Sequence, residues 1–186
     1  MAFLIGKKVA LDPIEPHEAD EFKRWLNDQE ILQFLAAYLP LSLGEEEEWI
    51  NELGKRKNDI VLGIYPLSDN PDRSSESNAI IGSIGLHNIN QKDRNATFGI
   101  VIGNEAYRGK SFGTEAARLL IDWGFNQLNL HRINSGAFAF NDRSIKMHLK
   151  LGFKEEGRER QKSFKNGAYH DHVIFGILRE EWKKQN

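Results

Sequence analysis

The chain has 186 residues, enough for one well-packed hydrophobic core, and we expect a single domain over residues 1–186. Its 25 Lys and Arg residues stand against 27 Asp and Glu, which gives a formal charge of -2 and a pI of about 6.3. Because the chain carries no net positive charge, nucleic acid is not an expected partner. The sequence has no cysteine, which excludes disulfides, zinc thiolates and thiol nucleophiles.

Hydropathy predicts no membrane contact. The apolar start at residues 1–5 is too short for a secretory signal, and the longest apolar run, at 34–41, is too short to cross a bilayer. We therefore expect a cytoplasmic protein, and we expect no metal site.

The first half of the sequence predicts a strand, two helices and three further strands. A strand at 9–11 leads into an amphipathic helix that begins near Pro16. Ser42 and Glu45 have the spacing of a capping box, so a second helix is expected from there to about Lys57. An antiparallel meander is expected from strands at 59–67, 79–89 and 95–103, with a polar loop at 68–78 that the fold does not require.

The second half predicts two helices and three strands. The helices are expected at 113–128 and 142–151, and the strands at 132–140, 154–164 and 172–178. The order β-α-α-β-β-β-α-β-α-β-β predicts an α/β (α+β) fold with a mixed, mostly antiparallel sheet of seven strands and about four helices. Such an order does not fix a function, which has to be inferred from local sites.

The segment before the third predicted helix has the features of an anion-binding loop. Residues 109–113 place successive backbone amides at a helix start, and Arg108 and Lys110 add positive charge. One alternative is a P-loop, because residues 109–111 read Gly-Lys-Ser; that motif, however, needs Gly at position 104, where this chain has Asn. Another alternative is an ordinary strand–helix turn with a solvated Arg and Lys.

A second motif lies at residues 141–153, NDRSIKMHLKLGF. It predicts a short helix with Asn141 at its N-cap and Gly152 at its end. Asn141, Ser144 and His148 follow the i, i+3, i+7 spacing of one helix face. Each also has a purely structural alternative: Asn141 as a helix cap, Ser144 as a residue without a specific role, and His148 as a surface polar residue.

Together, the two motifs resemble those of the GNAT superfamily of acyl-CoA-dependent N-acetyltransferases, over nearly the whole chain. The family pattern Arg/Gln-x-x-Gly-x-Gly/Ala is matched at Arg108 and Gly113, with Ser111 where Gly is usual. The pattern Asn-x-x-Ala/Ser-Ile-x-x-Tyr-x-x-x-Gly-Phe is matched by residues 141–153, with His148 where Tyr is usual. The phrases GIVIGNEAYRGKSFGTEA, NLHRI and NGAYHDHVIFGILREEW resemble the RimJ/RimL-like branch, which includes ribosomal-protein and spermidine acetyltransferases.

The resemblance implies a GNAT-like fold and acetyl-CoA as co-substrate. It implies that the strand ending at Ile102 pairs through its backbone with the pantetheine arm, and that an irregularity near Ile102 and Gly103 directs an N–H toward the thioester oxygen. The expected cofactor-binding residues are Ile100, Val101, Ile102, Arg108, Gly109, Lys110, Ser111, Phe112, Gly113, Asn141 and Ser144.

Acetyl transfer to an amine requires a neutral nitrogen, so a proton acceptor is needed. His87 and Glu105 are the titratable candidates, with a strand-end His, a loop carboxylate and a water chain as the alternatives. The departing thiolate needs a proton or a hydrogen-bond donor, and His148 is the candidate, since a neutral imidazole can donate one N–H.

We expect direct transfer to a primary amine of a small molecule or peptide, because no Cys is present to carry the acetyl group. The acidic run Glu45–Glu48 could attract a cationic amine or could simply stabilise a helix start. Four aromatic residues could line the acceptor pocket or pack the core: Trp25, Phe34, Tyr38 and Trp49. The alternative function is a non-catalytic CoA-binding module, and a remote one is a P-loop nucleotide-binding enzyme. A homodimer is compatible with these expectations.

Overall fold

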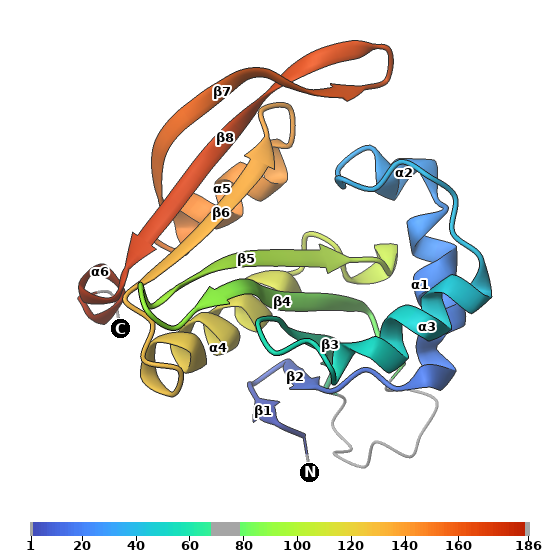
Figure 1. Cartoon of the computed structure of the whole chain (residues 1–186), viewed down its shortest axis with the longest axis horizontal. Coiled ribbons are helices and arrows are strands. Elements are labelled where there is room, and N and C mark those ends of the chain that lie inside the picture. Colours follow the sequence, from blue (N-terminus) through green and yellow to red (C-terminus); the bar gives the residue numbers. More distant parts are fainter. Residues whose placement is uncertain (1, 68–78, 185–186) are drawn as a thin grey trace.

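The computed structural model describes residues 2–67 and 79–184, which form one eight-stranded sheet with helices on both of its faces (Figure 1). The strand order is β1-β2-β3-β4-β5-β6-β8-β7. Every pair of neighbours is antiparallel except β5 and β6, which are parallel. The strands are β1 (Leu4–Ile5), β2 (Val9–Asp12), β3 (Ile60–Pro66), β4 (Gly82–Asn90), β5 (Asn95–Ile102), β6 (Arg132–Phe138), β7 (Lys154–Lys165) and β8 (Ala168–Leu178).

The helices connect these strands and cover the sheet. They are α1 (Ala19–Leu26), α2 (Gln29–Leu32), α3 (Leu43–Leu53), α4 (Phe112–Asn126), α5 (Asp142–Lys150) and α6 (Arg179–Lys183), with short 3₁₀ helices η1 (Pro16–Glu18) and η3 (Glu105–Tyr107). Within the described part of the chain, none of the helices combines the length and the apolar character that a membrane span requires.

The mixed, mostly antiparallel α/β architecture is confirmed, but the element count was too low. Within residues 2–67 and 79–184, eight strands and six α-helices are found where seven and about four were expected. The additions β1, α2 and α6 have only two, four and five residues, which is too short for a periodic pattern to be recognised. The helix expected to reach Lys57 ends at Leu53, with Gly54 as its C-cap. The predicted loop at 68–78 lies outside the described residues.

The central strands separate two hydrophobic clusters. On β5, Phe98, Ile100 and Ile102 pack with the cluster that α4 covers. Val101, one position out of phase, packs with the cluster that includes Phe22 and Ile50 of α1 and α3. This alternation follows from the period of two along a strand, and it gives β5 two different faces.

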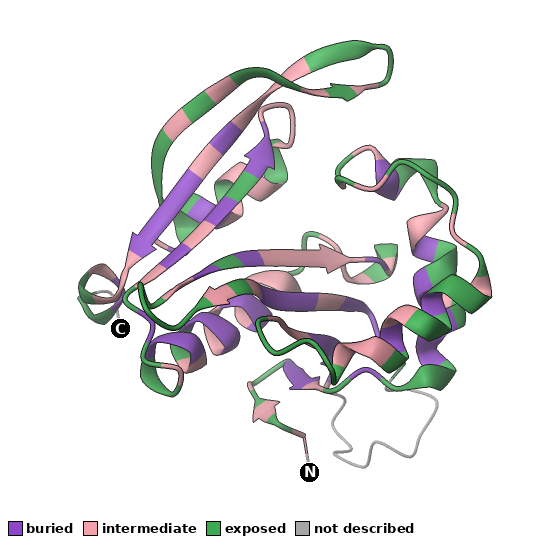
Figure 2. Cartoon of the chain, viewed as in Figure 1, coloured by how far each residue is buried: buried purple, intermediate pink, exposed green. Residues whose placement is uncertain are grey.

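The sheet opens between β5 and β6. These strands pair over three positions only, the last of which is Thr97 opposite Asn134. Beyond that pair β6 leaves with β8 and β7, and the two halves of the sheet diverge (Figure 1). Figure 2 shows buried residues recurring along β6 and β8, whereas the edge strand β7 is mostly exposed or intermediate.

A lysine joins the far ends of the two halves. Lys165, near the tip of the β7–β8 hairpin, donates from Nζ to the carbonyls of Leu32 and Ala37, at 3.1 and 2.8 Å. The hairpin is therefore attached to the segment at the end of α2, on the side where the sheet opens.

Candidate active site

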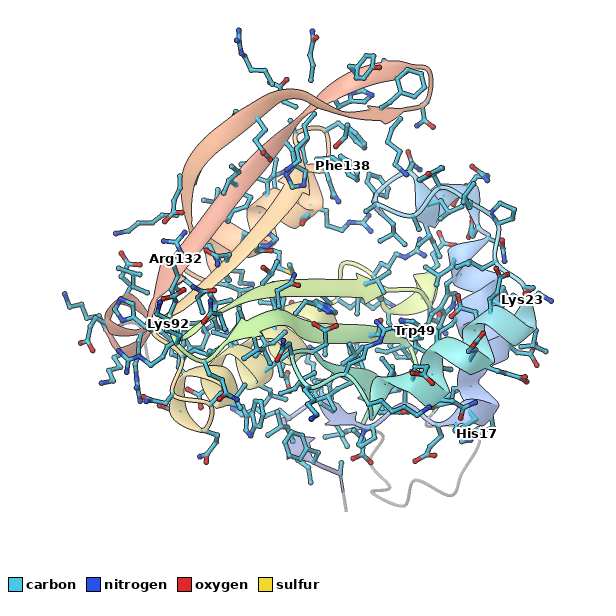
Figure 3. All side chains as sticks on the ribbon, in the orientation of Figure 1. His17, Lys23, Trp49, Lys92, Arg132 and Phe138 are labelled. Carbon is cyan, nitrogen blue, oxygen red and sulfur yellow. The ribbon has the colours of Figure 1, made fainter. Side chains whose placement is uncertain are left out.

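A cleft of about 1570 Å³ occupies the opening between β5 and β6. It extends from the start of α4 and from α5 toward α1 and α3, and Figure 3 labels Phe138 and Trp49, which line it from β6 and α3. The cleft is lined by all of the candidate catalytic and cofactor-binding residues except Lys110, whereas Gly103, expected at the strand irregularity, is buried and is not part of the lining. Lys110 is exposed beside the loop and is not part of the lining.

The open edge of β5 presents backbone groups to the cleft. The carbonyl of Phe98 accepts a hydrogen bond from Ser135 Oγ, and the carbonyl of Ile102 accepts one from Arg108 Nε, both at 3.0 Å. Because alternate residues of a strand direct their backbone groups to the same edge, Ile100 faces the opening as well. Val101, one position out of phase, directs its backbone groups toward β4, so its side chain, rather than its backbone, is available to the cleft.

The chain gains one residue at the end of β5. The ladder places Gly82 opposite Ile102, so its continuation would bring Gly103 opposite Ile81; instead the amide of Asn104 donates to the Ile81 carbonyl at 3.1 Å. The amide of Gly103 has no hydrogen-bond partner within residues 2–67 and 79–184. A step of this kind is a bulge, and it occurs at the two residues where the sequence led us to expect one.

Close packing explains why residue 103 is glycine. A Cβ atom built there would lie 1.9 Å from the indole of Trp25, so no larger residue fits beneath that ring. Trp25 of α1 is 3% exposed and also contacts Phe22, with ring centroids 5.3 Å apart. The end of β5 is thus fixed against α1.

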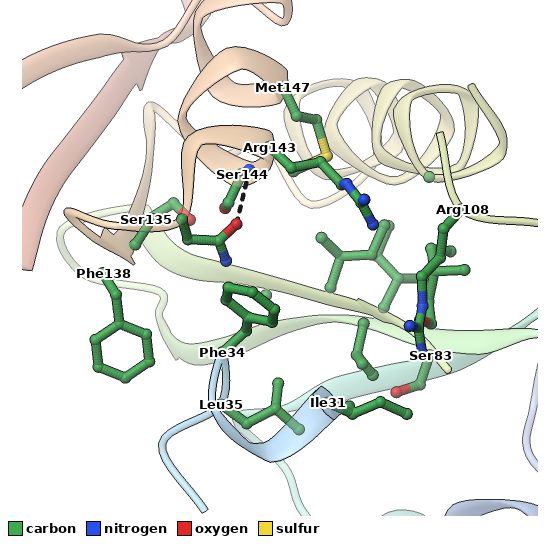
Figure 4. A pocket seen from close by; sticks show the side chains of 18 of the residues that line it. Ile31, Phe34, Leu35, Ser83, Arg108, Ser135, Phe138, Arg143, Ser144 and Met147 are labelled. Atoms are coloured by element: carbon green, nitrogen blue, oxygen red, sulfur yellow. Dashed lines mark hydrogen bonds between the residues drawn. The ribbon is translucent and has the colours of Figure 1, made fainter. Parts of the chain in front are cut away.

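Arg108 braces this segment from the other side. Its guanidinium donates to the carbonyl of Ile102 at 3.0 Å and to that of Gly103 at 2.7 Å. The sequence suggested that Arg108 supplies charge to a phosphate; in the structure its hydrogen bonds hold the irregular end of β5. Arg143 and Lys146 of α5 line the same cleft with exposed side chains, and Figure 4 shows Arg143 extending toward Arg108. Neither of these two basic residues was among the predicted site residues.

The loop before α4 reaches the helix through two left-handed residues, Gly109 at φ 74° and Ser111 at φ 69°. Ser111 is exposed, and its side chain makes no capping hydrogen bond. The first helical amides, at Phe112, Gly113 and Thr114, precede the first i→i−4 bond, which Glu115 donates to Ser111. These residues line the cleft, so the helix start presents backbone donors and a positive dipole end to it.

His148 is buried in an aromatic enclosure, with 2% exposure. Its ring is stacked on Phe175 at a centroid distance of 4.7 Å and meets Phe98 and Phe153 edge-on at 6.0 and 5.2 Å. Nδ1 lies 2.7 Å from the Ser144 carbonyl, and Nε2 lies 2.7 Å from Ser135 Oγ. Both nitrogens are therefore engaged, and the expected alternative of a surface polar residue is wrong for His148.

The environment of His148 favours its neutral form. Burial lowers the pKa of the imidazole below its usual 6.5, and the hydrogen bond to the Ser144 carbonyl opposes this shift as a smaller effect. A carbonyl can only accept, so Nδ1 carries the proton and Nε2 is left as an acceptor. Asn141 caps α5 by accepting from the amide of Ser144 at 3.1 Å, which fixes the helix start that carries this carbonyl (Figure 4).

His87 lies on the other face of the sheet from His148. Gly85 and Gly99 pair directly across β4 and β5, and a Cβ at Gly85 would lie 2.7 Å from His87 Nε2. The two glycines thus leave room for the imidazole above the sheet. His87 Nδ1 lies 3.8 Å from the carboxylate of Asp59, and the His87 side chain is 39% exposed toward the cleft.

The acidic run of α3 does not line the cleft. Glu45 forms a capping box with Ser42, accepting from the Ser42 amide at 2.8 Å. Glu46 is 3% exposed, and burial, with Glu45 as a secondary cause, raises its pKa. The helix-start interpretation of the run is the one that the structure supports. The carboxylates that do line the cleft are Glu30, Glu105 and Asp142.

Three of the four candidate aromatic residues line the cleft, namely Trp25, Phe34 and Trp49. Tyr38 is 77% exposed and lies outside the lining. Phe140 extends this wall: its ring centroid lies 5.9 Å from Phe34 and 5.3 Å from Phe138, with which it is stacked. The side of the cleft away from the α4 loop is therefore mainly aromatic.

The left-handed backbone at Ser111 predicts that glycine stabilises the loop. We expect Ser111→Gly to raise the free energy of unfolding, measured by urea titration, by about 1 kcal/mol, because a Cβ is unfavourable at this φ. Ser111→Ala is the matched control and should give no gain, since it keeps the Cβ. An equal gain from both variants would mean that the hydroxyl, not the backbone, disfavours serine here.

The burial of His148 predicts a pH dependence of stability. The folded-state pKa is lower than the unfolded one, so the unfolded state binds more protons between the two values and stability is lost as the pH falls through this window. Lowering the pH from 7.5 to 5.5 should therefore reduce the free energy of unfolding of the wild type more than that of His148→Phe.

This comparison also removes the contribution of His172, whose pKa burial likewise lowers, because His172 is present in both proteins. Equal losses in the two proteins would show that the His148 imidazole is not held in its neutral form by the fold.

The comparison with protein families matches residues 8–154 to the acetyltransferase (GNAT) domain. The SPbeta prophage-derived uncharacterized N-acetyltransferase YokL of Bacillus subtilis is 31% identical over 184 residues, which cover 98% of this chain and 97% of the relative. Spermidine N(1)-acetyltransferase of Escherichia coli is 36% identical over 101 residues, 54% of each chain. The structure of spermidine N-acetyltransferase from Vibrio cholerae in complex with CoA and spermine superposes with a TM-score of 0.82, at 24% identity and coverage of 94% and 98%.

The family match covers the strand edge, the α4 loop and the α5 motif, which meet at the cleft. The similarity to the RimJ/RimL-like branch, in which spermidine acetyltransferases belong, is confirmed by the E. coli relative. The chain is a member of the GNAT acetyltransferase family and uses acetyl-CoA as co-substrate for N-acetyl transfer.

Proposed function

We propose that this acetyltransferase acts on cationic primary amines, such as polyamines or peptide N-termini, as one catalytic domain. The observation that carries the proposal is a cleft that joins the start of α4, with Arg143 and Lys146 nearby, to an aromatic side on which the Glu30 carboxylate is exposed. The spermidine acetyltransferase relative supports an amine of this class. We also propose a cytoplasmic location, which the absence of cysteine suits.

The residues present fit acetyl-CoA. The amides at the start of α4, with Arg143 and Lys146 opposite them, are suited to the pyrophosphate. The open edge of β5 at Ile100 offers backbone groups to an extended pantetheine arm, as in the addition of a strand. Arg108 acts here by holding the carbonyls of Ile102 and Gly103, and so by placing the free Gly103 amide at the end of that edge. Gly103 lies five residues along β5 from Phe98, roughly 16 Å at a rise of about 3.3 Å per residue, so we place its amide at the pyrophosphate end of the pantetheine arm and the thioester near Phe98 and His87.

The amine has to lose a proton before it can attack. His87 is the base that we propose, because its imidazole lies above the Gly85–Gly99 pair at the cleft and has Asp59 on its Nδ1 side. A base in this position would take the ammonium proton and pass it to solvent, to which the ring is partly exposed. Glu105, exposed at the same cleft, is the second candidate.

Binding and turnover can be separated in one set of experiments. Acetyl-CoA should raise the melting temperature, because it binds the folded state, whereas ATP with magnesium should not. Release of free thiol from acetyl-CoA in the presence of a panel of amines should then identify acceptors. Stabilisation by acetyl-CoA without thiol release from any amine would favour a non-catalytic CoA-binding module, and stabilisation by ATP with magnesium alone would favour the P-loop alternative.

The carboxylate at Glu30 predicts a modest preference for cationic acceptors. Glu30→Gln should raise the KM for a polyamine about 2- to 5-fold at low salt and less at high salt, because exposed charge pairs contribute about 0–1 kcal/mol and salt screens them. Glu47→Gln is the matched control, since Glu47 is also exposed but lies outside the cleft. If both variants raise KM alike, the effect comes from net charge and not from the cleft.

A further inference from the structure

Ser135 occupies the point at which the sheet opens. It is the first residue of β6 beyond the last β5–β6 pair, Thr97 with Asn134. Along β6 it shares the inward face with Ile133 and Ala137, and it is 7% exposed. It is also one of the residues that line the cleft, as Figure 4 shows from close by. A hydroxyl at an inward position of a strand needs partners, and Ser135 has two.

One hydroxyl proton is shared between two acceptors. Ser135 Oγ lies 3.0 Å from the carbonyl of Phe98 and 2.7 Å from Nε2 of His148. Because Nδ1 of His148 donates to the Ser144 carbonyl, Nε2 has only a lone pair to offer. The proton can therefore lie toward His148 or toward Phe98, and in each case one acceptor is left without it. This arrangement accepts an additional proton readily: with Nε2 protonated, His148 donates to Ser135 and Ser135 donates to Phe98.

We propose that Ser135 and His148 form a proton shuttle at the reacting centre. In acetyl transfer the C–N bond forms, the C–S bond breaks, the nitrogen of the neutral amine loses one proton and the thiolate gains one. Ser135 Oγ takes the nitrogen's proton while its own proton moves to His148 Nε2. The reverse movement returns a proton through Ser135 Oγ to the departing sulfur. No proton is gained or lost by the pair over the cycle.

A single hydroxyl can serve both atoms because the attacking nitrogen and the departing sulfur are bonded to the same carbon. The return step is favoured by the surroundings of His148. The rings of Phe98, Phe153 and Phe175 enclose the imidazole, and no charged side chain contributes to its pKa shift. A positive charge there is not stabilised by an ion pair, so the imidazolium gives its proton back.

The shuttle complements His87. An ammonium loses two protons on its way to an amide: one makes it nucleophilic, and the second leaves as the amide forms. We assign the first to His87, which is open to solvent, and the second to Ser135, which is nearly closed off from it. This inference rests on the proposed acetyl transfer, and it adds Ser135 as a catalytic residue of that reaction.

The test compares Ser135→Ala, Ser135→Thr, His148→Phe and the Ser135→Ala/His148→Phe double variant. Ser135→Ala and His148→Phe should each lower kcat about 10²-fold, with the KM for acetyl-CoA changed less than about 2-fold. The double variant should be no slower than the slower single one, because the two residues act as a unit. Ser135→Thr keeps the hydroxyl and should retain most of the activity. Ser163→Ala, on β7 outside the cleft, is the control and should not alter kcat.

A readout in the free protein keeps the inference independent of turnover. ¹⁵N NMR of the histidine rings should place the proton of His148 on Nδ1, and Ser135→Ala should move the Nε2 resonance toward that of a nitrogen without a hydrogen bond. The shuttle would be overturned by a proton on Nε2 of His148 or by a Ser135→Ala kcat within about 2-fold of wild type. It would also be overturned if the losses of kcat in the two single variants added up in the double variant and paralleled the drop in melting temperature. Absence of thiol release in the wild type with every amine would overturn the proposed function instead, and would leave the NMR result standing.

Discussion

The end of β5–β6 pairing at Thr97 and Asn134 is the constraint on which the rest of the site depends. Once β6 departs, the backbone groups on one edge of β5 lose their strand partner, and buried groups of this kind need another. Two of the carbonyls are satisfied by side chains: Ser135 binds that of Phe98, and Arg108 binds that of Ile102. Ile100 lies between them, and its backbone groups on this edge face the cleft. The backbone groups of Ile100 are therefore left for a ligand, because side chains already bond the carbonyls on either side of them.

Periodicity predicted those parts of the fold that are long enough to carry a repeat. The meander of β3, β4 and β5 and the helices α4 and α5 lie where the alternation and the caps indicated. The short elements were missed because two to five residues cannot show a period, and they form through contacts that are distant in sequence. β1, for example, exists because Leu4 pairs with Leu11, and Glu115 of α4 accepts hydrogen bonds from the amides of Lys7 and Lys8 at the turn between β1 and β2.

The site could be predicted only where residue type and spacing specify the backbone. The family pattern has glycine at position 111, which agrees with the left-handed conformation found at Ser111, and the bulge after Ile102 was expected because Gly103 permits one. The partner of an arginine cannot be read in the same way. Arg108 reaches back to carbonyls five and six residues earlier, and spacing alone does not distinguish that from an arginine directed at a phosphate. Ser135 gave one usable signal, a polar residue between Ile133 and Ala137 on the buried face of a strand.

Position 148 shows how a departure from a motif can be resolved by geometry. The family pattern has tyrosine there, a side chain that carries its own hydroxyl at the far end of the ring. The imidazole of His148 is shorter and ends at Nε2, and the hydroxyl of Ser135 lies 2.7 Å beyond it. The two side chains together therefore bring a hydroxyl to the cleft from β6, whereas a tyrosine would bring it from α5. A tyrosine at 148 would direct its hydroxyl into the space that Ser135 Oγ fills, so the residues at 135 and 148 constrain each other.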